Sequence, residues 1–404
     1  MSTDRLRLSR RLLLGLPLGY AFAGSAGATT ATPAPPNKPF WEWFKHEPEV
    51  EEDWIVSPVA GRPFEVVIRP INPDRKQPVR RVFVLYPRPS SAYDIAISKI
   101  LDVFDDKHIN AEFTVVNFRN EDALARQALA RAKFLNAELV FSMGSEATAW
   151  LHMNLRDGSI PVVSVCSKDP VLLGQMKNYE SGSGTNFAFT SLNMPIDAQM
   201  AYVIDFRPQL RNMGILVSRD NVSAVETQAR PIAEFAKQRG IQVLYLQVEN
   251  PATAQAELAE LVRSAVVTMR KSDPSLDNSL FWITGSTAVF DEIATINKHS
   301  DRVPVLSVVP EVVRAGDDSA VLSIGISFES NAHLAAIYGA DVLMGVRQVG
   351  TLPVGIVSPP DIAINFRKAR EIGLSVPFEF VERASTIYDY DGQALRKSAA
   401  VGTN

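Results

Sequence analysis

Short, almost wholly apolar runs recur along most of the chain, and longer amphipathic segments separate them. The runs cover residues 82–86, 139–141, 161–166, 213–217, 280–284 and 303–308. Uniformly apolar strands are typical of parallel sheets, because such sheets are buried on both faces. In the segment 121–135, the residues that share one helical face are Leu124, Ala128, Ala132 and Leu135. This alternation predicts an α/β protein whose parallel sheets carry helices on both faces.

The number of strand–helix units favours two lobes over one. A chain of 404 residues with 46% hydrophobic composition is long enough for two cores. Late in the chain, a further strand at 362–365 leads into a helix that stops at Gly373. We therefore predict two doubly wound parallel-sheet lobes joined by three hinge crossovers, near residues 185–189, 305–309 and 353–359. The first lobe takes residues 80–188 and 309–353, the second takes 189–308 and 354–376, and a tail takes 377–404.

The N-terminal segment, residues 1–28, has the pattern of a secretory signal peptide. Its arginines precede an apolar run at 12–23, and Ala26-Gly27-Ala28 supplies small residues for cleavage. This run is about half of the roughly 20 residues that a membrane span needs, so we expect no stable membrane anchor. The pair Arg10-Arg11 fits a twin-arginine signal as well as an ordinary secretory signal, and the two stay open. Either signal predicts export to the periplasm.

Residues 29–79 form an extension that is rich in Pro and lacks the regular alternation of the rest of the chain. After a flexible linker comes an aromatic cluster, Phe40-Trp41-Glu42-Trp43-Phe44, and then an acidic stretch at 47–53. Such a cluster more often folds back onto its own domain to bury the rings. The alternative is that the rings dock to a partner, as in a ligand-sensing or scaffolding protein.

Charge and cysteine content exclude several classes of function. The formal net charge of −4 becomes −7 when residues 1–28, with one Asp and four Arg, are removed. This acidic balance argues against nucleic acid as a partner. The one cysteine, Cys166, allows no internal disulfide and is best explained as a small buried hydrophobe. The five histidines lack metal-ligand spacing, and no nucleophile elbow or phosphate-binding loop is present. We predict no enzyme, no metal and no cofactor.

Polar residues follow the predicted strands, where open parallel sheets bind their ligands. From the first lobe we select Ser90, Ser91, Tyr93, Ser145, Thr148 and Asp169. From the facing lobe and the hinge we select Asn221, Ser286, Thr287, Glu311 and Ser327. Ser145 and Thr148 are expected to donate to a ligand oxygen, and Tyr93 to cover an apolar part of the ligand. Asp169 or Glu311 would accept from an amine.

These positions have a second interpretation. Ser, Thr and Asp are the preferred N-caps of any helix, so a hydroxyl at a helix entrance needs no ligand. A helix N-terminus with free N–H groups is also a good site for a carboxylate. Arg88, Lys168 and Arg219 lie in the same loops and would favour an anionic ligand if they face the cleft. Long basic side chains, however, also point to solvent.

Six segments, in order, are similar to one family of proteins. The segment 361–377, Asp-Ile-Ala-Ile-Asn-Phe-Arg-Lys-Ala-Arg-Glu-Ile-Gly-Leu-Ser-Val-Pro, resembles that family's closing run, Val-Ile-Asn-Leu-Lys-Thr-Ala-Lys-Ala-Leu-Gly-Leu-x-Ile-Pro. The other matching segments are 144–148, 164–171, 184–187, 218–223 and 322–328. The family is that of ABC transporter substrate-binding proteins related to tryptophan-binding periplasmic proteins. The resemblance covers roughly residues 80–390.

The resemblance implies a periplasmic binding protein of type I fold that serves an ABC importer. Such a protein captures a small polar or amino-acid-like ligand in the interlobe cleft by hinge closure. An ABC permease and its ATPase are the implied partners. One departure concerns Ser327, which stands where the family usually has Asp. If that Asp holds a ligand amine in relatives, this chain does not bind an ordinary α-amino acid.

Overall fold

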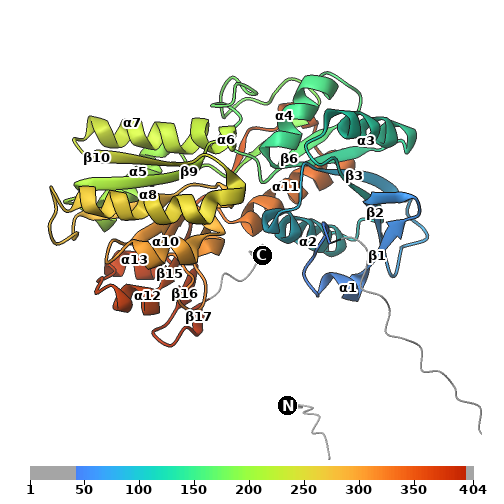
Figure 1. Ribbon diagram of the computed structural model, residues 1–404. Coiled ribbons are helices and arrows are strands. Elements are labelled where there is room, and N and C mark those ends of the chain that lie inside the picture. Colours follow the sequence, from blue (N-terminus) through green and yellow to red (C-terminus); the bar gives the residue numbers. More distant parts are fainter. Residues whose placement is uncertain (1–41, 397–404) are drawn as a thin grey trace, which may run out of the picture. The chain divides into compact units, whose positions relative to one another are not determined.

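The computed structural model describes residues 42–396, and the predicted signal peptide, the linker, Phe40 and Trp41 lie outside this range. Its first sheet has the strand order β1-β2-β4-β3-β5-β6-β7 (Figure 1). The strands are β1 (Trp54–Val59), β2 (Arg62–Pro70), β3 (Arg80–Tyr86), β4 (Ala111–Asn117), β5 (Leu139–Met143), β6 (Val162–Val165) and β7 (Phe187–Ala188). From β4 to β7 the neighbours are parallel, whereas β1 and β2 form an antiparallel hairpin whose strand β2 runs antiparallel to β4.

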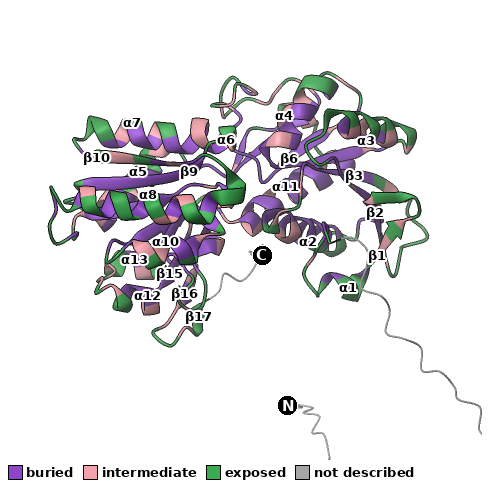
Figure 2. Cartoon of the chain, viewed as in Figure 1, coloured by how far each residue is buried: buried purple, intermediate pink, exposed green. Residues whose placement is uncertain are grey.

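Helices cover both faces of the first sheet. They are α1 (Val50–Asp53), α2 (Ser91–Asp106), α3 (Asp122–Phe134), α4 (Gly144–Leu155) and α11 (Phe328–Leu343), the last of which packs against α2 and β6. Strand β3 shows why both faces are apolar: Val82 and Val84 join the core with α2 and α11, and Phe83 joins the core with α3 and α4. Alternate side chains of a strand point to opposite faces, so both cores need apolar residues. The strands from β3 to β7 are accordingly buried along most of their length in Figure 2.

The second sheet has the strand order β10-β9-β11-β12-β13-β15-β16-β17. The strands are β9 (Asn212–Ser218), β10 (Gln242–Val248), β11 (Ser279–Ile283), β12 (Val305–Ser307), β13 (Leu322–Gly325), β15 (Asp361–Asn365), β16 (Thr386–Tyr388) and β17 (Ala394–Arg396). The part from β10 to β13 is parallel, and β15 is antiparallel to β13. Its helices and short turns are α5 (Ile196–Phe206), α6 (Val222–Ala224), η1 (Val225–Ala229), α7 (Arg230–Gln238), η2 (Pro251–Thr253), α8 (Ala254–Met269), α9 (Thr287–Phe290), α10 (Ile293–His299), η3 (Pro310–Val312), α12 (Phe366–Glu371) and α13 (Phe378–Arg383).

Three crossovers connect the two sheets. The first passes through β8 (Thr190–Ser191), and the third, after η4 (Val349–Thr351), passes through β14 (Gly355–Ile356). These two strands pair in parallel and form a small sheet of their own. The second crossover is the short link from Gly325 to α11. Gly325 fits there because a Cβ at this position would lie 1.8 Å from the carbonyl oxygen of Val308.

All six apolar runs of the sequence form strands, and the predicted helix at 121–135 is α3. The late strand and helix are β15 and α12, and Gly373, at a φ of +69°, follows the helix. The chain thus has two α/β lobes with parallel sheets and three crossovers.

The positions of several lobe boundaries differ from those expected. We expected the second crossover near 305–309, but β12 and β13 both lie in the second sheet. The reason is that these two parallel strands are connected by the short turn η3 instead of a full helix, so the chain leaves the second sheet one strand later. The expected tail contributes β16 and β17 to the same sheet, and the extension contributes β1 and β2 to the first sheet.

The described part of the aromatic cluster folds back onto the first lobe. Trp43 and Phe44 are 8% and 3% exposed. The indole N–H of Trp43 donates to the carbonyl oxygen of Pro63 at 3.0 Å. Both rings pack against Tyr86, with ring centroids 6.0 and 6.2 Å from its own. Trp43 and Phe44 therefore follow the fold-back interpretation and are not free to dock to a partner.

Candidate functional site

A small cavity lies between the two lobes, at the carboxyl ends of strands from both sheets. Its volume is about 40 Å³, room for only a few water molecules. Its first-lobe lining comes from the loops after β3, β5 and β6 and includes Arg88, Ser90, Ala92, Tyr93, Gly144, Ser145, Glu146, Cys166 and Lys168. The second lobe and the crossovers add Leu192, Asn221, Ser223, Gly285, Thr287, Phe290 and Phe328. A solute in this cavity would touch both lobes.

Two long helices begin at the cavity. Helix α2 starts beside Ser90 and helix α4 starts at Gly144, and neither N-terminus has a side-chain cap hydrogen bond. Gly144 has a φ of +77°, and a Cβ there would lie 2.1 Å from the hydroxyl oxygen of Tyr93. Glycine therefore permits both the turn from β5 into α4 and the close approach of the Tyr93 ring. Uncapped N–H groups and the helix dipole make such ends favourable for an anion.

Lys168 reaches the cavity from the loop after β6. At the end of this strand Cys166 has a φ of +53°, in the left-handed region that non-glycine residues rarely adopt. Two hydrogen bonds fix this turn: the N–H of Cys166 donates to Asn331 Oδ1 at 2.8 Å, and that of Lys168 donates to Ser145 Oγ at 3.0 Å. The Lys168 ammonium then lies against the second lobe, because a Cβ at Gly285 would be 2.2 Å from its Nζ.

The charge of Lys168 has little compensation. The residue is 6% exposed. Within residues 42–396 its backbone N–H donates to Ser145, whereas its ammonium forms no ion pair or hydrogen bond. Burial lowers the pKa of Lys168 to about 8. Burial also raises the pKa of the neighbouring Cys166 thiol, which is therefore uncharged near neutral pH. The charged neighbours are Glu146, which opposes the lowering, and Arg88, which adds to it.

Arg88 is paired within its own lobe. Its guanidinium lies 3.6 Å from a carboxylate oxygen of Glu146, which also lines the cavity. Burial lowers the pKa of Arg88, but the nearby Tyr93, Glu146 and Asp220 raise it more strongly, so Arg88 stays charged. Asp220 belongs to the second lobe, so this electrostatic contact also spans the two lobes.

The second lobe presents loops that its own hydrogen bonds hold in place. Asn221 Oδ1 accepts from the N–H of Ala224 at 3.1 Å and from the hydroxyl of Ser223 at 3.0 Å. The N–H of Gly285 donates to Gln228 Oε1 at 2.8 Å. The lining residues Asn221, Ser223, Gly285 and Thr287 thus form a neutral polar wall opposite the cationic wall of the first lobe.

Solved structures share this architecture at low sequence identity, although no protein-family model and no curated protein matches the sequence. A conserved domain protein from Vibrio cholerae has 19% identity and a TM-score of 0.61, over 76% of this chain and 99% of its own. An ABC domain from Streptococcus pneumoniae, in complex with L-Trp, has 15% identity and a TM-score of 0.60. The match covers 76% of this chain and 100% of that chain. A ligand-free, open substrate-binding protein with adhesive properties from Clostridium difficile has 17% sequence identity and a TM-score of 0.57. The match covers 76% of this chain and 98% of that protein's chain. The chain has the type I periplasmic binding protein fold.

Within this binding-protein fold, the predicted site residues fall into two groups. The cavity brings together Ser90, Tyr93, Ser145, Asn221 and Thr287. Outside its lining lie Ser91, Thr148, Asp169, Ser286, Glu311 and Ser327. Arg219, considered with the basic residues, pairs with Glu249 on the surface at 2.6 Å. The structure thus brings five of the eleven selected residues together between the lobes, and their role in binding a ligand stays a prediction.

Most of the outlying polar groups are engaged in local hydrogen bonds. The hydroxyl of Thr148 donates back to the carbonyl oxygen of Gly144 at 2.8 Å, and Thr148 is fully buried. Asp169 accepts from the N–H groups of Val171 and Leu172 with one oxygen and from the Tyr179 hydroxyl with the other. These two side chains serve the structure of the first lobe.

The same holds for the outlying residues of the second lobe and the hinge. Ser286 is fully buried, and its hydroxyl oxygen accepts from the N–H of Ser218 at 3.3 Å. Ser327 is the N-cap of α11 and accepts from the N–H of Ser330 at 3.0 Å. Glu311 accepts from the N–H of Phe328 at 2.6 Å. Ser91 is exposed.

Several lining residues were not selected from the sequence. Glu146 and Gly285 lie in loops at the carboxyl ends of strands, where we expected the ligand to bind. The sequence therefore indicated the correct loops, but not all of the lining residues within them. Leu192 follows the very short strand β8, which has no clear apolar run of its own. Phe290 and Phe328 supply apolar surface, with ring centroids 6.4 Å apart. In the sequence, only the closeness of these two residues to the selected Thr287 and Ser327 indicated that they line the cavity.

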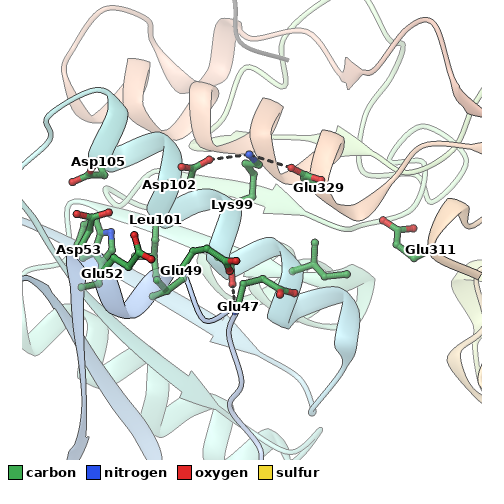
Figure 3. A pocket seen from close by; sticks show the side chains of 14 residues that line it. Glu47, Glu49, Glu52, Asp53, Lys99, Leu101, Asp102, Asp105, Glu311 and Glu329 are labelled. Atoms are coloured by element: carbon green, nitrogen blue, oxygen red, sulfur yellow. Dashed lines mark hydrogen bonds and ion pairs between the residues drawn. The ribbon is translucent and has the colours of Figure 1, made fainter. Parts of the chain in front are cut away.

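A larger groove of about 510 Å³ lies at the junction of the extension with α2 (Figure 3). The carboxylates that line it are Glu47, Glu49, Glu52, Asp53, Asp102, Asp105, Glu311 and Glu329. Its one ammonium, Lys99, lies between Asp102 and Glu329 at 2.8 and 3.1 Å, as Figure 3 shows. In the part of the chain that the structure describes, no group of His, Cys, Asp and Glu side chains could hold a metal ion. Likewise, none of the described helices is long and apolar enough to cross a bilayer.

Proposed function

We propose that this chain is the periplasmic solute-binding component of an ABC importer and captures a small polar solute by hinge closure. The observation that carries the proposal is the interlobe cavity, whose lining comes from both sheets at the carboxyl ends of their strands. A solute there stabilises the closed arrangement, because only in that arrangement does it touch both lobes. The cavity is much smaller than the roughly 300 Å³ or more of typical ligand pockets, so a solute fits only when the lobes lie further apart than in this arrangement.

Transport, rather than catalysis, suits the groups in the cavity. The signal-peptide pattern of residues 1–28 supports export, and the fold is that of solved ABC substrate-binding proteins. Delivery of the solute would involve an ABC permease and its ATPase. Two of the lining residues are not set up as nucleophiles: Cys166 is kept as a thiol by burial, and the hydroxyl oxygen of Ser145 accepts from the backbone N–H of Lys168.

Binding is tested by thermal unfolding of the purified chain with a panel of amino acids, hydroxy and oxo acids, purines and sugars. A solute at about 100 times its Kd should stabilise the protein by about 2.7 kcal/mol and raise the Tm by several degrees. Isothermal titration then measures the affinity and should give one site per chain. Absence of a shift with every compound would count against a binding protein.

The second candidate is a ligand-sensing or scaffolding protein that uses the same cavity. Its aromatic docking surface is reduced, because Trp43 and Phe44 are buried in the first lobe. The genes beside this one distinguish the two functions. A permease and an ATPase would favour transport, whereas a kinase or a cyclase would favour sensing.

A further inference from the structure

We propose that the solute is a small anion without an ammonium group, a hydroxy or oxo carboxylate, and that Lys168 selects it. This inference rests on the proposed function and specifies the solute class of the same cavity. It narrows the small polar or amino-acid-like solute that was expected from the sequence, where Arg88, Lys168 and Arg219 already favoured an anion.

The first argument is the position of the Lys168 ammonium. It belongs to a side chain that is more than nine-tenths buried, lines the cavity and has no partner among residues 42–396. A charge on a largely buried side chain is costly when no opposite charge pairs with it, and the cost is relieved when an opposite charge arrives. A solute carboxylate in the cavity supplies that charge. Because Nζ also lies against Gly285, the ion pair would form at the junction of the two lobes.

The second argument is the direction of the helices. Helices α2 and α4 are 16 and 12 residues long, and both begin at the cavity without a side-chain cap. Their first N–H groups and dipoles add favourable interactions with the same anion. The hydroxyls of Ser90 and Thr287 and the amide of Asn221 can bind a hydroxyl or carbonyl oxygen of the solute.

The third argument is the lack of a place for an ammonium group. Glu146 is the one carboxylate in the described lining, and Arg88 lies 3.6 Å from it. The expected amine acceptors, Asp169 and Glu311, are outside the cavity. A solute ammonium would therefore meet two cations, Lys168 and Arg88, and one carboxylate that already pairs with Arg88. Repulsion disfavours this arrangement, as like charges at close range do elsewhere.

The test uses compounds that differ only at the amine. Alanine is compared with lactate and pyruvate, leucine with its 2-hydroxy and 2-oxo acids, and glutamate with 2-oxoglutarate. Lactamide controls for the carboxylate, and ribose and glucose control for neutral solutes. In at least one series, the acid that lacks the ammonium group should bind about tenfold or more tightly than its amino acid and its amide.

The matched variants are Lys168→Met in the cavity and Lys177→Met on the surface, where Lys177 is exposed. Lys168→Met should weaken binding of the preferred acid about tenfold or more, and Lys177→Met should leave it unchanged. The ligand-free Tm of Lys168→Met should stay the same or rise, because the variant removes an unpaired charge from a largely buried side chain. Loss of binding with a rise in Tm separates selection of the ligand from a role in folding.

The pH dependence gives an independent readout. The acid binds the protonated ammonium, so its affinity in the parent should fall as the pH rises through about 8, the pKa of Lys168. The charged and titratable neighbours of Lys168 are Glu146, Arg88 and Cys166. The arginine of Lys168→Arg keeps its charge up to about pH 9.5, so the affinity of this variant for the acid should be nearly independent of pH around 8. The same variant tests the role of the charge if Lys168→Met fails to fold.

Two kinds of failure are distinguishable. If amino acids or sugars bind in the cavity as tightly as the acids, or if Lys168→Met binds the acid normally, this inference is wrong and the proposed function stands. If none of the compounds binds, including those of the wider panel, both fail.

Discussion

Glu311 is a carboxyl group whose surroundings oppose its charge. One oxygen accepts from the N–H of Phe328 at the start of α11, and the other is buried and has no hydrogen-bond partner within residues 42–396. Burial raises its pKa to about 7, and the nearby Asp361 and Glu329 add to the increase. Since the pKa is higher in the folded state than in the unfolded state, folding binds protons between pH 4.5 and 7. Stability should therefore fall as the pH rises through this window.

Glu311→Gln tests the effect of this charge. The amide oxygen can still accept from the Phe328 N–H, but it carries no charge at any pH. The variant should be more stable than the parent by roughly 1 to 3 kcal/mol at pH 8, and nearly equal to it at pH 4.5. Urea unfolding at both values measures the difference. Asp94, with a pKa raised to about 6 by burial, is unchanged in both proteins and cancels in the comparison. Equal stabilities at pH 8 would contradict the assignment.

At the residue scale, the rule that ligands bind at the carboxyl ends of parallel strands identified the loops but not the orientation of their side chains. Ser145 and Thr148 both follow β5, yet Ser145 lines the cavity while Thr148, one turn into α4, bonds back to Gly144. Side chains in a helix point back over the preceding turn, which explains this difference. Asp169 follows Lys168 directly and turns away to bind two N–H groups. Such choices depend on packing against the rest of the fold, which one sequence does not specify.

At the scale of elements, buried parallel strands were predictable and mixed strands were not. Runs such as 82–86 and 213–217 are apolar at every position because both faces of the sheet are covered. Strands β1 and β2 belong to an antiparallel hairpin at the edge of the first sheet, and only Trp54 of β1 is buried. Residues 29–79, which include both strands, were expected only to form a Pro-rich extension without regular alternation. The hairpin nevertheless forms because Val66 and Ile68 of β2 enter the core while the backbone of β2 pairs with β4.

The extension should therefore contribute to the stability of the first lobe, and Trp43→Ala tests this expectation. Removing the ring leaves a cavity beside Phe44 and Tyr86 and deletes the hydrogen bond to Pro63. The expected loss is about 3 to 5 kcal/mol in the free energy of unfolding. Chemical denaturation measures it, and Glu42→Ala, at an exposed position, is the control. If Trp43→Ala were as stable as the control, the extension would not belong to the core.

At the scale of the whole molecule, some hydrogen bonds link the two lobes away from the cavity. Asn193 lies in the first crossover and is 5% exposed. Its Oδ1 accepts from the N–H of Asp169 in the first lobe at 3.2 Å. Its Nδ2 donates to the carbonyl oxygen of Thr227 in the second lobe at 2.9 Å. Asn193 thus links both lobes to the hinge without lining the cavity.

Asn193→Ala should weaken solute binding from a distance. The variant loses two or three buried hydrogen bonds, each worth about 0.5 to 1.5 kcal/mol. These hydrogen bonds are expected to favour the closed arrangement. Their loss therefore lowers the population of closed molecules, and the apparent Kd for the solute rises by the same factor. We expect binding of the preferred solute to weaken about five- to a hundredfold, measured by isothermal titration.

Asn154→Ala, which removes a hydrogen bond within α4, is the matched control. Small-angle X-ray scattering should show a smaller fraction of closed molecules at a fixed solute concentration. Unchanged affinity with normal folding would mean that closure does not depend on this link, and that the cavity residues alone hold the lobes together.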